Sequence, residues 1–442
     1  MCQSETMHLA VDISFAHTDY LWGIPGSWQG YQYYGPDFYE DVARIAQRGM
    51  FDMIFFGDAA ETPEHFDDGF SVPVRKGVRW PKHDMTPMIP LMARVAPKLG
   101  FGLTMSTTYH HPFHVARMFG SLDHITQGRM AWNAVTSAYK NEAANYGFEK
   151  MMPAAERYAR AREHLEVVQK LWASVEPDAI KLDRENGIFA DPSKVHFVDH
   201  KGEYYNVRGP LPCIPSPQGK PVIIQAGQSE DGLNLAAKHA DMQFVQRRTA
   251  KSITEHRARL DELLARHGRQ SRDLGVFWAV RTQVAETRED ALRKERFYLD
   301  SVPENAGLIE LSIWYGIDFT KLDPKMKLAD AAEAIRAEQV MWGTFQEILK
   351  TEDPDITVEE MGRKMLATRS NHVIGSPKDV ADHLEEAHEA GGRNGGIILA
   401  RSFAAPGMLR DFVELVVPEL QRRGLVRKDY PETVTLRGLL NS

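Results

Sequence analysis

The chain has 442 residues, of which 43% are hydrophobic and 26% charged, as in ordinary folded proteins, so disorder is excluded as its main state. Its net charge is −8 and it has no cluster of Lys and Arg with interleaved aromatics, which argues against a nucleic-acid partner. No uncharged apolar run approaches the roughly 20 residues that cross a bilayer, and the N-terminus lacks a signal-peptide pattern, so we expect a cytoplasmic protein without a membrane partner.

Short runs of β-branched and aromatic residues alternate with amphipathic helical patterns along the chain. This alternation is typical of a parallel sheet built from successive strand–helix units. Eight such runs favour a closed (β/α)8 barrel, the TIM barrel of the α/β class, over an open sheet, although periodicity alone does not separate the two. The expected strands are residues 8–15, 51–58, 99–107, 129–137, 221–227, 242–248, 275–285 and 395–402.

Helical patterns fill the connections between these runs. Residues 36–49 are an example, because Pro36 suits a first helical turn and Gly49 suits a C-terminal stop. Similar patterns predict helices at residues 112–126, 156–172, 252–268 and 407–424.

Three stretches break the rhythm of strands and helices. We expect one domain spanning residues 1–442, with these stretches as insertions at the ends of the barrel. The third stretch contains helical patterns of its own and is long enough to form a lid. The insertions are residues 61–84, 181–220 and 302–376.

In a (β/α)8 barrel the functional groups extend from the carboxyl ends of the strands. Asp58 ends the apolar run MIFFGD, where a carboxylate is either a cap or a ligand contact. Thr104 and Ser106 share one face of the third strand and place small hydroxyls where barrel cores usually carry branched aliphatic residues; they are either site residues or hydrogen-bonded core hydroxyls. Asn133 on the fourth strand is a buried amide that needs hydrogen-bond partners or costs about 1–3 kcal/mol. A polar ligand beside strands three and four would supply them.

The segment AGQSEDG places Gly227 and Ser229 at the start of a helix. Free backbone amides and the positive end of the helix dipole favour an anion such as a phosphate there. A serine that merely caps the helix explains the same motif equally well, so both interpretations stay open.

The 17 histidines raise the question of a metal site. His111 and His114 lie at a helix start, but their spacing forms neither an HExxH pair nor a facial triad, so we expect no metal. Cys2 and Cys213 are too few for a disulfide framework. The chain also lacks a GxSxG elbow, a P-loop and a GxGxxG turn after a strand, which argues against serine hydrolases, P-loop enzymes and dinucleotide dehydrogenases.

An ordered series of longer motifs runs through the chain, namely FDMIFFGD, TMSTTYHHPFHVARMFGSLDHITQGRMAWNAVTS, ERYARAREHLEVVQKLW and PVIIQAGQSEDG. Over nearly its whole length the chain resembles the nitrilotriacetate and dibenzothiophene-sulfone monooxygenase family, a branch of the luciferase-like flavin monooxygenases. The resemblance implies a bacterial-luciferase-type barrel that binds FMN without a covalent bond. It also implies that a separate NAD(P)H:flavin reductase supplies FMNH2, that O2 is the co-substrate, and that the chain forms homodimers or homotetramers.

The resemblance also implies roles for individual residues. By position, the isoalloxazine ring is expected beside Asp58, Thr104, Asn133 and Ser137. The phosphate is expected beside Tyr158, Gly227, Gln228 and Ser229. Three residues are expected to act in catalysis, His17 in proton transfer and Thr104 with Asn133 in positioning O2. Which flavin atom carries the oxygen, C4a or N5, stays open.

Two positions depart from the family pattern. Ala154 stands where many relatives have a histidine four residues before the tyrosine of the ERY motif, and His110 stands where many have glutamate. An aromatic N-terminal segment either lines an apolar or aromatic substrate pocket or packs in an ordinary way, and contains Trp22, Trp28, Tyr31, Tyr33 and Tyr34. Basic residues of the first insertion either meet an anionic substrate or, as we expect, form a solvated loop; they are Arg75, Lys76, Arg79 and Lys82.

Two other functions remain open at this point. A deazaflavin-dependent oxidoreductase uses the same barrel with a larger cofactor and no O2. A barrel that only binds or stores flavin needs none of the polar groups at the reactive edge. The set Thr104, Asn133 and His17 argues against the second of these.

Overall fold

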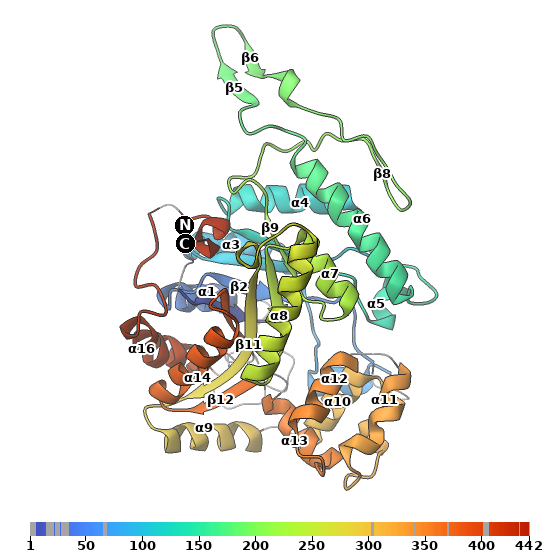
Figure 1. The fold of residues 1–442 in the computed structure, drawn as a ribbon, viewed down its shortest axis with the longest axis vertical. Helices are drawn as coiled ribbons and strands as arrows, with labels where there is room; N and C mark the ends of the chain where they lie inside the picture. Colours follow the sequence, from blue (N-terminus) through green and yellow to red (C-terminus); the bar gives the residue numbers. More distant parts are fainter. Residues whose placement is uncertain are drawn as a thin grey trace.

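The eight predicted runs all form strands, and they close into a parallel barrel (Figure 1). The last strand pairs with the first, and β10 pairs with β11, so the expected (β/α)8 barrel is confirmed. Around the ring the strands are β1 (His8–Asp12), β2 (Met53–Phe56), β3 (Gly100–Ser106), β4 (Met130–Val135), β9 (Val222–Gln225), β10 (Met242–Val245), β11 (Gly275–Val284) and β13 (Gly395–Ala400). This computed structural model describes residues 6–14, 22, 27, 35–64, 69–301, 305–338, 342–368, 371–400, 406–432 and 434–441.

Most strands are shorter than predicted at their carboxyl ends. The run predicted at residues 221–227, for example, is a strand only from Val222 to Gln225. The residues beyond the strand leave the sheet and form the loops at the mouth of the barrel. The loops that carry the chemistry are therefore longer than the sequence pattern indicates.

Side chains point to alternate faces along each strand, and this divides the hydrophobic core into two clusters. On β2, Met53 and Phe55 belong to one apolar cluster, whereas Ile54 and Phe56 belong to another that includes residues of the surrounding helices. Because side chains alternate across a strand, the first cluster fills the barrel and the second lies between barrel and helices. The barrel filling is tight at Gly102, where an added Cβ would lie 2.9 Å from the sulfur of Met53.

Helices surround the barrel in Figure 1. The predicted helices are present with small shifts at their ends, as for α1 (Pro36–Arg48), which begins at its proline and ends before Gly49. The others of the ring include α3 (Met88–Val95), α4 (Pro112–Ile125), α5 (Lys140–Asn145), α6 (Ala154–Trp172), α7 (Glu230–His239), α8 (Ala250–Arg266), α9 (Arg288–Asp300), α14 (Pro377–Ala390), α15 (Pro406–Asp411) and α16 (Val417–Arg422), and the short α17 (Leu436–Leu440) lies near the C-terminus.

The three stretches predicted as insertions have different structures. Residues 61–84 contain the short helix α2 (Ser71–Lys76) and a loop. Residues 181–220 include most of the β5–β6 hairpin (Ile180–Asp183 and Ile188–Ala190) and the small β7–β8 pair (His200–Lys201 and Asn206–Val207), which project from the barrel (Figure 1).

The third stretch holds a group of helices with a hydrophobic core of its own, centred on residues such as Leu311, Tyr315 and Phe345. Its helices are α10 (Ala306–Tyr315), α11 (Ala332–Glu338), α12 (Trp342–Thr351) and α13 (Val358–Thr368). It ends in a strand that the sequence did not predict, β12 (Asn371–Gly375), which pairs in parallel with the second half of β11. β11 is therefore long enough to belong to the barrel at one end and to this pair at the other.

Candidate functional site

A cavity of about 400 Å³ opens at the carboxyl ends of β2, β3 and β4. Its walls come from the second half of β3, from the loop after β2, from α5 and from the first insertion. Functional groups of a (β/α)8 barrel collect at this end. The cavity therefore lies where the sequence predicted the chemistry.

Thr104 and Asn133 lie side by side in the barrel interior. They are direct partners in the register of β3 and β4, and the Asn133 side-chain amide donates to the Thr104 hydroxyl oxygen at 2.8 Å. Both are buried, with 5% and 3% of their surfaces exposed. The Asn133 Oδ1 atom has no hydrogen-bond partner among the described residues. A buried polar atom without a partner costs free energy, so a ligand that donates to it would be stabilised here.

Ser137 follows β4 in a left-handed backbone conformation, with φ of 54°. This turn directs its carbonyl oxygen to the guanidinium of Arg157 on α6, which donates to it. Its hydroxyl donates to the Ser106 hydroxyl at 2.9 Å. The ends of β3 and β4 are thus joined by two layers of paired polar side chains, Thr104 with Asn133 and Ser106 with Ser137.

Four ionisable side chains that line the cavity form what we call the cavity cluster: Asp58, Glu61, Lys82 and Glu142. Burial raises the pKa of Asp58, against the opposing attraction of Lys82. Burial raises the pKa of Glu142 to about 7 and lowers the pKa of Lys82 to about 7. In each case burial has the largest effect on the pKa, because loss of contact with water disfavours the charged form.

Two contacts hold the cluster in place. The Lys82 ammonium donates to the backbone carbonyl oxygen of Ala59 at 2.8 Å. Glu61 accepts from the Arg79 guanidinium at 3.2 Å, and the side chains of this pair are 4% and 1% exposed. The expectation of a solvated loop is therefore wrong for Arg79 and Lys82, because the chain folds back and buries both.

The predicted phosphate residues also come together. The Ser229 hydroxyl donates to the Tyr158 hydroxyl at 3.1 Å and caps α7 by accepting from the Gly232 amide at 3.2 Å. A Cβ added at Gly227 would lie 2.9 Å from the Tyr158 hydroxyl, so this position keeps the backbone open to a ligand. Gln228 accepts from the Arg247 guanidinium, which brings a cation to the start of the helix.

The remaining predicted positions give mixed outcomes. His17 lies outside the described residues, as do Trp28, Tyr31, Tyr33 and Tyr34. Trp22 is 48% exposed and donates from its indole to the Lys76 carbonyl oxygen at 2.9 Å. His110 lines the cavity with its Nε2 atom 3.3 Å from the Tyr146 hydroxyl, and Ala154 is the first residue of α6.

Sequence reasoning missed four charged residues of these sites, namely Glu61, Glu142, Arg157 and Arg247. Arg157 lies in the quoted ERY motif but was not singled out, and the other three lie on ordinary helices or loops without a motif around them. Among the described residues, no group of three or more His, Cys, Asp or Glu side chains could hold a metal ion. Within the same ranges, no helix has the length and hydrophobicity needed to cross a membrane.

Comparisons with known proteins agree with this geometry. A model of the luciferase-like monooxygenases matches residues 24–394. A dibenzothiophene-sulfone monooxygenase from Rhodococcus erythropolis (strain XP) is 35% identical over 447 residues, covering 97% of this chain and 95% of that protein.

Two solved structures extend the agreement to three dimensions. The crystal structure of a long-chain alkane monooxygenase matches with a TM-score of 0.87 at 32% identity, covering 100% of this chain and 96% of that chain. A riboflavin lyase, solved with modified FMN and the substrate riboflavin, matches with a TM-score of 0.86 at 26% identity, covering 98% and 95% of the two chains.

The resemblance predicted from the sequence motifs is confirmed by these matches. Likeness of this kind over nearly the whole chain carries the reaction class as well as the barrel. The chain belongs to the luciferase-like monooxygenase family, and it is a flavin-dependent monooxygenase that acts on a small organic substrate.

Proposed function

We propose that the flavin is FMN, bound in its reduced form after delivery by a separate NAD(P)H:flavin reductase, and that O2 is the second substrate. The observation that carries this proposal is the grouping of Tyr158, Ser229 and Arg247 at the start of α7. Two hydroxyls, a guanidinium and the positive end of a helix dipole are donors that suit a terminal phosphate. FMN carries such a phosphate, and riboflavin does not.

The barrel end fits the ring of this cofactor. The unpartnered Oδ1 atom of Asn133 can accept from a ring nitrogen that carries a hydrogen. Thr104 and Ser106 line the adjacent cavity wall, and the paired hydroxyl of Ser137 supports that wall. In this proposal these residues and Asp58 orient the ring, while Tyr158, Gly227, Gln228 and Ser229 hold the phosphate.

The flavin supplies electrons and activates oxygen when it is bound, and the protein supplies position and a dry site. Buried side chains of β3 and β4 exclude water from the ring, and the Thr104–Asn133 pair fixes where O2 and substrate meet it. The predicted role of His17 in proton transfer remains a prediction, as does an apolar or aromatic substrate, because His17 and all the N-terminal aromatic residues except Trp22 lie outside the described ranges.

A comparison of FMN and riboflavin tests the phosphate site. Arg247→Gln is expected to weaken binding of FMN by about 10-fold, because a charge-assisted hydrogen bond contributes roughly 1.5–3 kcal/mol. Riboflavin binding should stay unchanged. Quenching of flavin fluorescence measures both, with Arg259→Gln as the matched control, since Arg259 is an exposed cation paired with Glu230 on α7. Equal losses for FMN and riboflavin would contradict this phosphate site.

Turnover needs a second test. We expect oxygen uptake only when a flavin reductase and NADH keep FMN reduced, and no uptake when reduced deazaflavin replaces it. Activity with the deazaflavin in the absence of O2 would favour the alternative oxidoreductase. Full activity of an Asn133→Ala variant would favour the other alternative, a barrel that binds flavin without using these polar side chains in catalysis.

We also propose that the chain forms a homodimer or homotetramer through the arm that carries β5–β8. The arm exposes large apolar side chains, with Leu182 62%, Phe189 68% and Phe197 58% exposed, and it projects from the barrel (Figure 1). Exposed apolar side chains that cluster on one projecting segment often form protein–protein interfaces. Sedimentation velocity is expected to show monomers for Phe189→Asp with Phe197→Asp, and an unchanged assembly for Phe297→Asp, whose side chain is 53% exposed on α9. Unchanged assembly in the double variant would refute the proposal.

A further inference from the structure

The Glu142 carboxyl has a position in the cavity that the family resemblance did not assign. It lies on α5 with 4% of its surface exposed, and it forms part of the cavity wall. Its Oε1 atom accepts from the Ala60 amide at a long 3.4 Å, the Ser137 side chain also hydrogen-bonds to the carboxyl, and the Oε2 atom has no hydrogen-bond partner among the described residues. A carboxyl held this way is desolvated and only partly hydrogen-bonded, so a ligand that fills the cavity meets it directly.

The charged groups around Glu142 do not balance the negative charge of its carboxylate. On the loop after β2 lie Asp58 and Glu61, two further carboxyls that disfavour a third negative charge. On the first insertion lies Lys82, a cation that interacts with Glu142 and whose own pKa is lowered to about 7 by burial. Among the described residues, Tyr109 after β3 and Tyr146 at the end of α5 also interact with it. Burial raises the pKa of Glu142 to about 7, with smaller contributions from the charges of Glu61 and Asp58 and against the hydrogen bonds from Ser137 and Ala60.

We propose that Glu142 is a flavin-binding residue that works as a neutral acid: it takes up one proton from solvent when flavin enters the cavity and donates a hydrogen bond to the ring. This inference rests on the proposed function, because it takes FMN as the occupant. The only change is the addition of a proton to the carboxylate, with no electron transfer and no covalent bond to the flavin.

Two physical effects drive the uptake in the same direction. A bound ring displaces water from the cavity and removes the remaining solvation of the Glu142 carboxylate, which favours its neutral form. The neutral form can donate through the oxygen that now lacks a partner, whereas the carboxylate can only accept. Ligand binding and protonation are therefore linked, and flavin should bind more weakly as pH rises above 7.

Calorimetry can count the proton. Reduced FMN is titrated anaerobically at pH 8 in two buffers with different heats of ionisation, into wild type, Glu142→Gln and Glu64→Gln. Glu64 is the control, because it is an exposed carboxyl of the first insertion and not part of the cavity wall. Protons that belong to the flavin itself are common to all three proteins, so the difference between variants isolates the residue.

We expect wild type and Glu64→Gln to take up close to one more proton per FMN than Glu142→Gln does. Equal uptake in all three proteins would overturn the inference and leave FMN binding, and hence the proposed function, intact. Failure of wild type to bind reduced FMN at all would overturn the proposed function, and this inference with it.

Infrared spectroscopy provides a readout that needs no turnover. In the flavin-free wild type, the carbonyl band of a protonated carboxyl should grow as pH falls through about 7, and the band should be missing from Glu142→Gln. At pH 8 the same band should appear in wild type when FMN is added. If Glu142→Gln fails to fold, this appearance still decides the matter in wild type alone, because its absence refutes proton uptake.

Discussion

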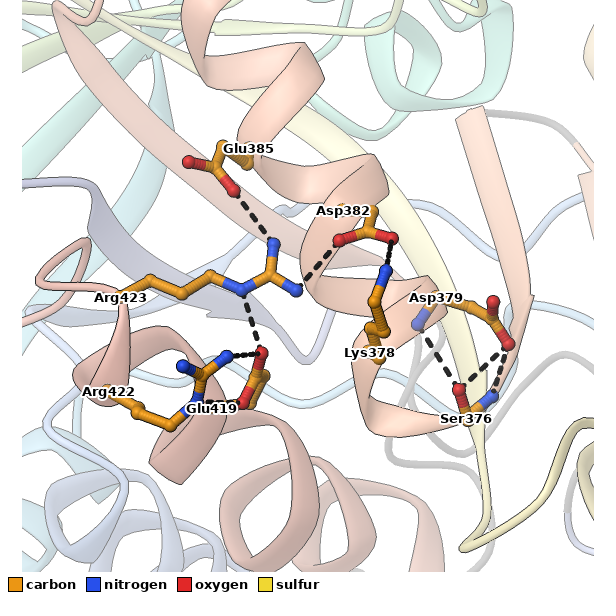
Figure 2. A network of polar contacts seen from close by, with 8 residues as sticks. All are labelled: Ser376, Lys378, Asp379, Asp382, Glu385, Glu419, Arg422 and Arg423. Carbon is orange, nitrogen blue, oxygen red and sulfur yellow. Dashed lines mark hydrogen bonds and ion pairs between the residues drawn. The ribbon is translucent and has the colours of Figure 1, made fainter.

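Two groups of acidic and basic residues in this protein behave in opposite ways. The cavity cluster holds Asp58, Glu61, Lys82 and Glu142 away from water. The surface network lies on α14 and α16, where Arg423 contacts Asp382 at 2.7 Å, Glu385 at 2.8 Å and Glu419 at 2.8 Å (Figure 2). In the surface network each carboxylate finds a cation, whereas in the cavity cluster carboxyls outnumber the nearby cations.

The pKa values record the difference. Hydrogen bonds from Arg422 and Arg423 lower the pKa of Glu419 to about 2, so that it stays charged. Burial raises the pKa of Glu142 to about 7, so that it changes charge near neutral pH. Cationic partners at the surface stabilise the charged form of a carboxyl, whereas burial without such partners favours its neutral form. The surface network therefore suits fixed electrostatics, and the cavity cluster suits proton exchange.

The largest effect is expected from the buried pair of Glu61 and Arg79. Glu61→Ala removes the carboxylate that pairs with the Arg79 guanidinium, which is 1% exposed. The free energy of unfolding should fall by about 3–5 kcal/mol, the usual cost of breaking a buried ion pair by removing one partner. Urea denaturation measures it. Glu419→Ala in the surface network is the matched change, and its midpoint should move far less. Similar shifts for the two variants would break the contrast between the regions.

Asn133 tests a buried polar group that carries no charge. Asn133→Ala removes the donor to Thr104 and the free Oδ1 atom together. We expect turnover with reduced FMN to fall by about 100-fold, comparable to removing one preorganised hydrogen-bond group from an active site. Initial rates of oxygen uptake measure this. Asn186→Ala, on the exposed turn of the β5–β6 hairpin, should retain the wild-type rate, and a variant at Asn133 with the same rate would refute its role.

The fold was predictable from the sequence because its signals are local. Each barrel strand is a short apolar run, and strand–helix alternation repeats along the chain, so eight runs were enough to give the barrel. β12 was not predicted because its residues, NHVIG, mix polar and apolar side chains and follow a long stretch of helical patterns. Its place is set by the length of β11, to which it pairs, and that is a tertiary property.

The site was predictable only in part. Thr104 and Asn133 stand out because a hydroxyl and an amide interrupt apolar strands at the end where barrels carry their chemistry. Glu142 and Lys82 do not stand out, since a glutamate on a short helix and a lysine in a polar loop are ordinary in sequence. Their chemistry arises from burial, which depends on how the first insertion folds over the mouth of the barrel.

The pH dependence of stability should differ in sign between the two regions. For Glu142 the folded pKa of about 7 lies above the unfolded value of 4.5, so the folded state binds the extra proton between these values. Stability contributed by this protonated state is fully present below pH 4.5 and is lost as pH rises to about 7. Glu142→Gln should therefore be more stable than wild type at pH 8, by about 3 kcal/mol, and equal to it near pH 4.

Melting temperatures at a series of pH values, without flavin, check this. Glu419→Gln provides the opposite case, because its folded pKa of about 2 lies below the unfolded 4.5. Its contribution is present above pH 4.5 and is lost as pH falls towards 2, so this variant should be less stable than wild type at neutral pH only. The same sign for both variants would mean that burial and pairing do not separate the two carboxyls.

The smallest effect is expected at the centre of the surface network. Arg423→Met keeps the aliphatic part of the side chain and removes the ion pairs to Asp382, Glu385 and Glu419 (Figure 2). Partly exposed surface pairs contribute little each, so we expect a loss of about 1 kcal/mol in low salt. Salt screens such pairs, so the loss should shrink in 1 M NaCl, whereas the loss from Glu61→Ala should persist because water and ions do not reach that pair. Flavin binding should be unchanged, since α14 and α16 do not form the cavity wall. A change in FMN affinity would mean that charge on the outer helices reaches the barrel mouth, and the two regions would then have to be treated as one electrostatic unit.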